Sequence, residues 1–100
     1  MIQEIRENED GIIFVLSGKI YADEATILRE KILEYLENSN QHIICDLTGV
    51  TYIDSAGLGV LVAVHKRTKE NNRTLIIKGL NGMVKEMFEL TRLTKVFTIQ

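Results

Sequence analysis

The chain has 100 residues, of which 45% are hydrophobic and 26% are charged, and its formal net charge is −2. This length suits one globular domain spanning residues 1–100, and the weakly acidic balance gives no electrostatic reason to bind nucleic acid directly. The single cysteine, Cys45, excludes an intrachain disulfide and lies in an apolar run, where we expect a small buried hydrophobe.

Two short apolar runs and an amphipathic segment make up the first part of the chain. Ile2 to Arg6 and Ile12 to Leu16 flank an Asp-Gly pair, a strong tight-turn signal, so they predict an antiparallel hairpin. From Asp23 to Leu36 apolar residues recur every three or four positions, which predicts an amphipathic helix with Asp23 as its N-cap. The polar run Asn38-Ser39-Asn40 is expected to end this helix.

Strands and helices alternate through the rest of the chain. His42 to Leu47 predicts a central strand covered on both faces, followed by an exit loop and by a helix that begins near Ser55. Cations are favourable near a helix C-terminus, which explains Lys66, Arg67, Lys69 and Arg73 without a ligand. A strand over Thr74 to Lys78, a helix from a cap at Asn81 to Leu90, and a strand over Lys95 to Ile99 follow. This order implies an α/β sheet with parallel members and an antiparallel edge.

The run from Ile53 to Val62 places one serine and two glycines between a carboxylate and an apolar segment. Ser55 follows the central strand, so its hydroxyl is expected to cap the free amides of the next helix, with Asp54 as a turn residue. Gly57 and Gly59 weaken a helix, so they indicate close packing on the sheet or the approach of another molecule. In open α/β sheets, ligands bind at this edge, beyond the carboxyl ends of the strands.

Enzymatic interpretations of the same run find little support. Its glycine spacing follows neither the dinucleotide nor the P-loop pattern, and a hydrolase elbow needs a glycine where Ile53 stands. His42 and His65 are far apart in the sequence, which favours structural or surface roles and predicts no metal site. Asp46, at a strand end, is placed like the phosphorylated aspartate of a receiver domain, but the chain has no acidic pair after an early strand to hold the magnesium ion of such a site. We therefore expect no cofactor, no metal and no catalytic residue.

The run from Ile53 to Leu61 resembles the signature of bacterial anti-sigma-factor antagonists, the STAS domain family. The similarity extends to Leu16–Ile20, Ile44–Leu47 and Phe88–Leu93, so it covers practically the whole chain. The resemblance implies a single α/β domain, with a small mixed sheet of about five strands and helices packed mainly on one side.

The same resemblance implies a phosphorylation switch without enzymatic activity. In this family, the serine after the signature aspartate is modified by a partner kinase that is also the anti-sigma factor, and here that serine is Ser55. The unmodified protein binds the kinase and frees a sigma factor, phosphorylation ends binding, and a serine phosphatase reverses it. The positions that the resemblance assigns to partner binding are Tyr21, Asp23, Asp54, Ser55, Ala56, Gly57, Leu58 and Gly59.

The chain departs from the family before its first helix. Where the family often shows Gly-Glu-Leu-Asp, this chain has Gly18-Lys19-Ile20-Tyr21, with Asp23 two residues further on. Two other functions stay open, a STAS-like ligand-binding or scaffold module without phosphorylation and an enzyme that uses Ser55. The polar start of the chain lacks a signal-peptide pattern and the longest apolar run, Val60 to Val64, is too short for a bilayer, so we expect a cytoplasmic protein without a membrane partner.

Overall fold

Five strands form one mixed sheet, in the order in which they follow along the chain. The computed structural model describes residues 1–100 and places the strands in the order β1-β2-β3-β4-β5. β1 is antiparallel to β2, and the other neighbours are parallel, which confirms the predicted hairpin and α/β class. The elements are β1 (Ile2–Asn8), β2 (Gly11–Ile20), α1 (Ala22–Asn38), β3 (Ile43–Ile53), α2 (Ser55–Glu70), β4 (Leu75–Lys78), α3 (Gly82–Leu90), the 3-10 helix η1 (Leu93–Lys95) and β5 (Thr98–Ile99).

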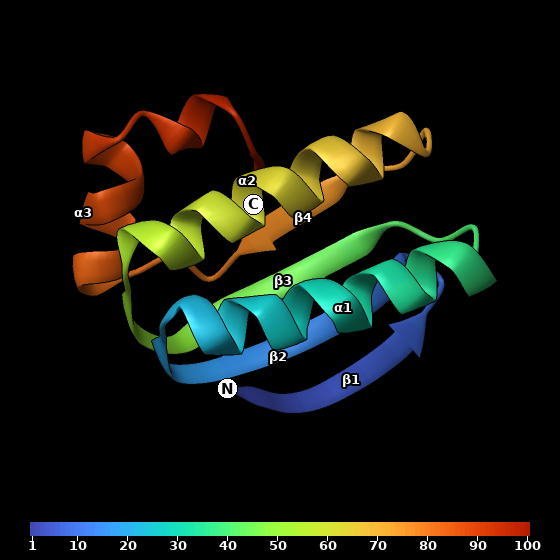
Figure 1. The fold of residues 1–100 in the computed structure, drawn as a ribbon, viewed down its shortest axis with the longest axis horizontal. Helices are drawn as coiled ribbons and strands as arrows, with labels where there is room; N and C mark the ends of the chain where they lie inside the picture. The colour runs from blue at the N-terminus through green and yellow to red at the C-terminus, as the bar shows by residue number, and fades with distance from the viewer.

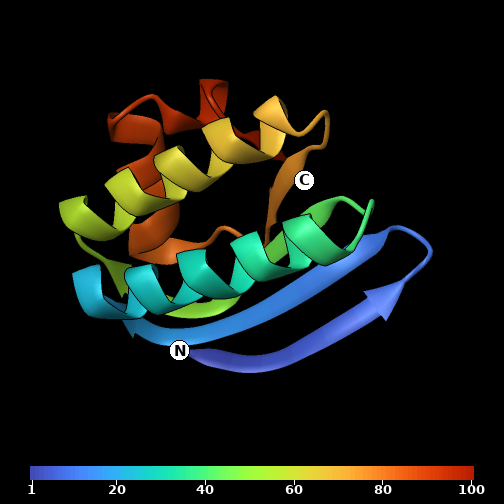
Figure 2. The same ribbon diagram turned by 45° about the vertical axis from the view of Figure 1, so that its right-hand side comes forward.

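The helices lie mainly on one side of this sheet, as expected. α1 and α2 run side by side over the same face in both views, and α3 lies beside the start of α2 (Figures 1 and 2). Each connection between parallel strands leads to the next strand across the sheet, always towards β5. Because such crossovers are right-handed, successive crossovers towards the same edge place their helices on the same face of the sheet. No helix is both long enough and apolar enough to span a membrane.

The core lies between the sheet and the two long helices. Inward-facing side chains such as Phe14 of β2 and Leu47 of β3 are fully buried against the apolar faces of α1 and α2. Cys45 is also fully buried, and burial raises the pKa of its thiol to about 12. The thiol therefore stays protonated at neutral pH, and the prediction of a buried hydrophobe is confirmed.

β3 is longer than the strand predicted from the sequence. The expected exit loop is part of the strand, because β2 continues beside it and pairs Gly18 with Val50 and Ile20 with Ile53. β3 is the central strand of the sheet, as predicted. Ile43, Ile44 and Cys45 are all buried although successive side chains of a strand point to opposite faces, so cover on both faces is confirmed for this part of the strand. Asp46, the next residue on the outer face, is half-buried.

The two edges of the sheet are unlike. β1 carries a charged pair on its surface, with Nε of Arg6 3.0 Å from Oε1 of Glu4. β5 has only two residues and is shorter than predicted. The reason is Phe97, which turns into the core and packs against the rings of His65 and Phe88 instead of extending the strand.

The start of α1 also differs from its prediction. Its N-cap is Tyr21, and Asp23 lies inside the first turn. Oε1 of Glu24 accepts a hydrogen bond from the backbone N–H of Tyr21 at 2.8 Å, so the side chain three residues later secures this helix start. Asp23 remains favourable where it is, because a carboxylate in the first turn complements the helix dipole.

Residues just before β4 hold the opposite end of the helical layer in place. The guanidinium of Arg73 donates hydrogen bonds to the carbonyls of Ser39 and Leu36, where α1 ends. Arg73 thus satisfies the C-terminus of α1, although its place in the sequence suggested α2. His42 accepts the N–H of Thr74 at Nδ1, 3.0 Å away, which confirms a structural role for this histidine.

His65 is buried with an unpaired ring nitrogen, and we expect it to make stability depend on pH. Its Nδ1 has no hydrogen-bond partner, and its ring lies 5.2 Å from that of Phe97. Burial, and to a lesser degree the charge of Lys69, lower the pKa of His65 below its usual 6.5. Below pH 6.5 the unfolded chain therefore binds a proton at His65 more readily than the folded chain does. The contribution of the neutral His65 to the free energy of unfolding is complete above pH 6.5 and declines as the pH falls below that value.

The variant His65→Phe tests this expectation in thermal and urea unfolding between pH 7.5 and 5.5. Removing an unpaired buried nitrogen while keeping an aromatic ring against Phe97 should raise the free energy of unfolding by about 1 kcal/mol at pH 7. The loss of stability on acidification should also become smaller than in the unaltered chain. An identical pH dependence in both proteins would contradict this role of His65.

Candidate functional site

The three helices begin at the same end of the molecule. The carboxyl ends of β2 and β3 also lie at this end, at the left of Figure 1, and β4 points towards it but ends earlier, beside Asp46. Helix N-termini present free backbone N–H groups and a partial positive charge, so anions are favourable here. It is the edge where open α/β sheets bind their ligands.

Ser55 is the first residue of α2, and its hydroxyl is free. The N-cap is Asp54, whose Oδ1 accepts the backbone N–H of Gly57 at 2.7 Å. The predicted roles of these two residues are therefore exchanged: Asp54 caps the helix, and the Ser55 hydroxyl makes no hydrogen bond within the protein. Ser55 is exposed, so a second protein can reach its oxygen without opening the fold.

The exchanged roles of Asp54 and Ser55 predict how replacing each residue changes the stability of the fold. Asp54→Ala should lower the free energy of unfolding by about 1 kcal/mol, the usual effect of a lost N-cap. Ser55→Ala should change it by less than about 0.5 kcal/mol, since an exposed side chain without a partner is removed. Urea unfolding of the two variants beside the unaltered chain measures both values. A larger loss for Ser55→Ala than for Asp54→Ala would contradict this assignment.

The two glycines of the run meet different surroundings. Gly57 is buried, and a Cβ placed there would lie 2.9 Å from Cγ1 of Ile53 and 3.1 Å from the carbonyl oxygen of Ile20. Gly59 is exposed, and a Cβ there would meet no atom within 4 Å. Of the two explanations offered by the sequence, close packing therefore applies to Gly57, and an open surface applies to Gly59.

The residues assigned to partner binding also divide into an exposed and a buried group. Ala56, Tyr21 and Asp23 are exposed together with Ser55 and Gly59, and Asp54 is half-buried. Gly57 and Leu58 are buried, so they pack the helix against the sheet, and the side chain of Leu58, only 6% exposed, offers no contact surface.

A hollow of about 390 Å³ lies beside the start of α1 and the end of β3. It is lined by Lys19, Tyr21, Thr51, Tyr52 and Met83. The rings of Tyr21 and Tyr52 are 5.8 Å apart, and the backbone N–H of Asp54 donates to the carbonyl of Ile20 at 3.2 Å. This bond joins the hollow to the start of α2. Tyr52 and Met83 were missed by sequence reasoning, because only the fold brings β3 and α3 to the same place.

Asp46 has a structural role beside the end of β4. Its Oδ1 accepts two hydrogen bonds from Thr48, from the hydroxyl at 2.6 Å and from the backbone N–H at 3.0 Å. Burial raises the pKa of Asp46, but these bonds and the nearby charges of Lys78 and Arg6 lower it more, so the carboxyl stays ionised. No three His, Cys, Asp or Glu side chains gather anywhere to hold a metal ion.

Fold and site define a small α/β domain that presents an exposed serine at the start of its second helix. The family model described as "STAS domain" matches residues 3–100, so the chain belongs to the STAS domain family. It is 32% identical over 96 residues to the anti-sigma-B factor antagonist of Bacillus subtilis, covering 96% of this chain and 87% of that protein. It is 33% identical over 98 residues to the anti-sigma-B factor antagonist of Listeria monocytogenes, covering 97% and 86%.

Solved structures share the fold at lower identity. The crystal structure of TM1081 from Thermotoga maritima has a TM-score of 0.86 at 22% identity, covering 96% of this chain and 83% of that one. The anti-sigma factor antagonist SpoIIAA of Bacillus has a TM-score of 0.74 in both forms, unphosphorylated (13% identity, 97% and 86% covered) and phosphorylated (14% identity, 97% and 89% covered). The fold inferred from the resemblance is confirmed.

Proposed function

We propose that this chain is an anti-sigma-factor antagonist controlled at Ser55. Without phosphate it binds an anti-sigma factor that is also a serine kinase, and a sigma factor is released. Phosphorylation of Ser55 by that kinase ends the binding, and a serine phosphatase restores it. The curated relatives carry the name of a regulatory protein rather than of an enzyme, which supports a binding role.

The observation that carries the proposal is the exposed Ser55 hydroxyl, free of hydrogen bonds at a helix start. A kinase must place this oxygen against the terminal phosphate of ATP, and here no internal bond has to break first. Since Asp54 provides the cap, the helix keeps its start when Ser55 is modified. A site that serves only stability would have the serine in the capping position.

A phosphate at Ser55 is compatible with the fold. The group adds about −1.5 to −2 charges, and a helix N-terminus favours an anion by about 0.3–1 kcal/mol at an exposed position. Asp54 opposes this gain, because it is the residue next to Ser55 and its negative carboxylate already accepts a hydrogen bond from the start of the helix. SpoIIAA, whose phosphorylated form is as similar in fold to this chain as its unphosphorylated form, supports a switch without refolding.

The partner surface that we propose combines exposed residues around Ser55 with the adjoining hollow. Tyr21 and Met83 are 44% and 58% exposed and line the same hollow, so together they offer adjoining apolar surface to a partner. Lys19 adds a cation at the rim of the hollow. We therefore expect the partner to present an apolar side chain and an acidic group here.

Phosphorylation by candidate kinases tests the proposal. The purified protein is incubated with ATP and with each anti-sigma-type serine kinase from the same genome, and the product is mapped by mass spectrometry. One phosphate on Ser55 is expected, absent from Ser55→Ala and retained in Ser39→Ala. If no such kinase modifies Ser55 but one of them binds, the chain is a scaffold module without this switch.

A further inference from the structure

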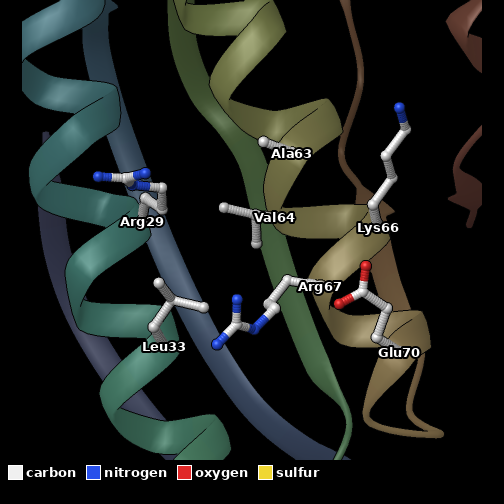
Figure 3. Close-up of a pocket in the computed structure, with 7 residues that line it drawn as sticks. All are labelled: Arg29, Leu33, Ala63, Val64, Lys66, Arg67 and Glu70. Carbon is white, nitrogen blue, oxygen red and sulfur yellow. The ribbon is translucent and has the colours of Figure 1, made fainter.

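A second candidate site lies between α1 and α2, away from Ser55. A groove of about 290 Å³ is lined by Leu33, Ala63 and Val64 and by the charged residues Arg29, Lys66, Arg67 and Glu70. Figure 3 shows Arg67 extending from α2 across the gap towards Leu33 of α1, whereas Lys66 extends away from it. Arg67 is twelve residues after Ser55, which corresponds to about 18 Å along a helix.

The two arginines of this groove lack ionic partners. The ion pairs within the protein are Arg6 with Glu4 and Lys31 with Glu34, so neither Arg29 nor Arg67 is in an ion pair, although Glu70 lines the same groove. Arg29 lies one helical turn before Leu33, on the same face of α1. Two unpaired guanidinium groups from adjacent helices therefore line one groove of a protein whose net charge is negative.

The favourable position of cations near a helix C-terminus explains only part of this arrangement. It applies to Arg67, in the last turn of α2, but not to Arg29, which lies in the middle of α1. The charged lining residues are three cations, Arg29, Lys66 and Arg67, and one anion, Glu70, so their net charge is opposite and equal to that of one phosphate dianion. The planar, forked donors of the two arginines suit phosphate oxygens. Between them, Leu33, Ala63 and Val64 form an apolar floor.

The size of the groove favours a small molecule over a protein. Its volume of about 290 Å³ is at the lower end of the range for small-molecule sites. A stable protein interface covers about 800 Å² on each partner, much more than seven lining residues provide. We propose that this groove binds a small molecule with a phosphate group on Arg29 and Arg67 and an apolar body on Leu33 and Val64. This site does not depend on the switch at Ser55.

Phenyl phosphate and inorganic phosphate are suitable probes, since both are largely dianions at pH 7.5 and only the first has an apolar body. Each is titrated into the full chain at constant ionic strength, and backbone amide shifts are followed by NMR. Saturable shifts are expected at Arg29, Leu33, Val64 and Arg67. Phenyl phosphate should bind more tightly than inorganic phosphate, and the double variant R29Q/R67Q should bind it at least about tenfold more weakly.

The control is K85Q/K95Q, which removes the same charge from exposed positions outside the groove. It should bind phenyl phosphate as the unaltered chain does. Equal weakening in both double variants, or shifts that do not saturate, would overturn the proposal. Binding of a glutamate-rich peptide at these amides without binding of phenyl phosphate would also overturn it, since the groove would then be a protein contact.

Discussion

Phosphorylated Ser55 is expected to weaken binding of the anti-sigma partner by about 100-fold to 1,000-fold, while the midpoint of thermal unfolding stays close to that of the unmodified chain. In the complex we propose, the partner covers the start of α2, and a dianion buried there without a matched cation meets a desolvation penalty of several kcal/mol. The helix terminus returns at most about 2 kcal/mol. Each 1.4 kcal/mol of the difference is about tenfold in affinity.

Titration calorimetry with the partner measures this effect on the unmodified chain, the phosphorylated chain and Ser55→Glu. The matched control is Ser39→Glu, which adds a charge at the C-cap of α1, at the far end of the helical layer. It should leave the affinity within about threefold of the unmodified value. Unchanged affinity after phosphorylation of Ser55 would rule out the proposed switch, and loss of the folded state would show that the phosphate acts on the fold.

Gly57→Ala should destabilise the fold by about 2 kcal/mol, within the usual range for overpacking. The added methyl group would meet Ile53 and the backbone of Ile20, and it would lie 3.2 Å from Oδ1 of Asp54, the atom that caps the helix. The first turn of α2 would have to move away from the sheet, which weakens the cap as well. Partner binding should fall for the same reason, because Ser55 would move with the turn.

Gly59→Ala is the matched control, two positions further along the same helix. A Cβ meets nothing there, so alanine should stabilise the chain by about 0.5–1 kcal/mol through its better helix propensity. Urea unfolding of both variants gives the two changes with opposite signs. If Gly57→Ala were as stable as the unaltered chain, the helix would not need this glycine in order to pack.

Much of the fold and the position of the exposed serine could be predicted from the sequence. The hairpin, the alternation of strands and helices and the end of α1 follow from short-range patterns of apolar and polar residues. The division of roles between Asp54 and Ser55 could not. Both residue types are good N-caps, and the choice depends on a helix start that sequence patterns place only to within a few residues.

Other features depend on contacts between distant parts of the chain. The last residues of β3 were predicted as a loop because their strand character comes from pairing with the end of β2. Tyr52 and Met83 meet in one hollow only after β3 and α3 are in place. The sequence does not indicate the groove between α1 and α2, because the basic residues of α2 are explained by their place near a helix C-terminus and Arg29 belongs to another helix.

The unlike edges of the sheet bear on how this protein behaves when no partner is present. An unpaired strand edge is a template for self-association and aggregation. β5 offers only two residues to an incoming strand, and the Glu4–Arg6 pair gives β1 a charged exterior. Neither edge therefore offers a long, uncharged strand to a second copy, and we expect the free protein to resist edge-to-edge association.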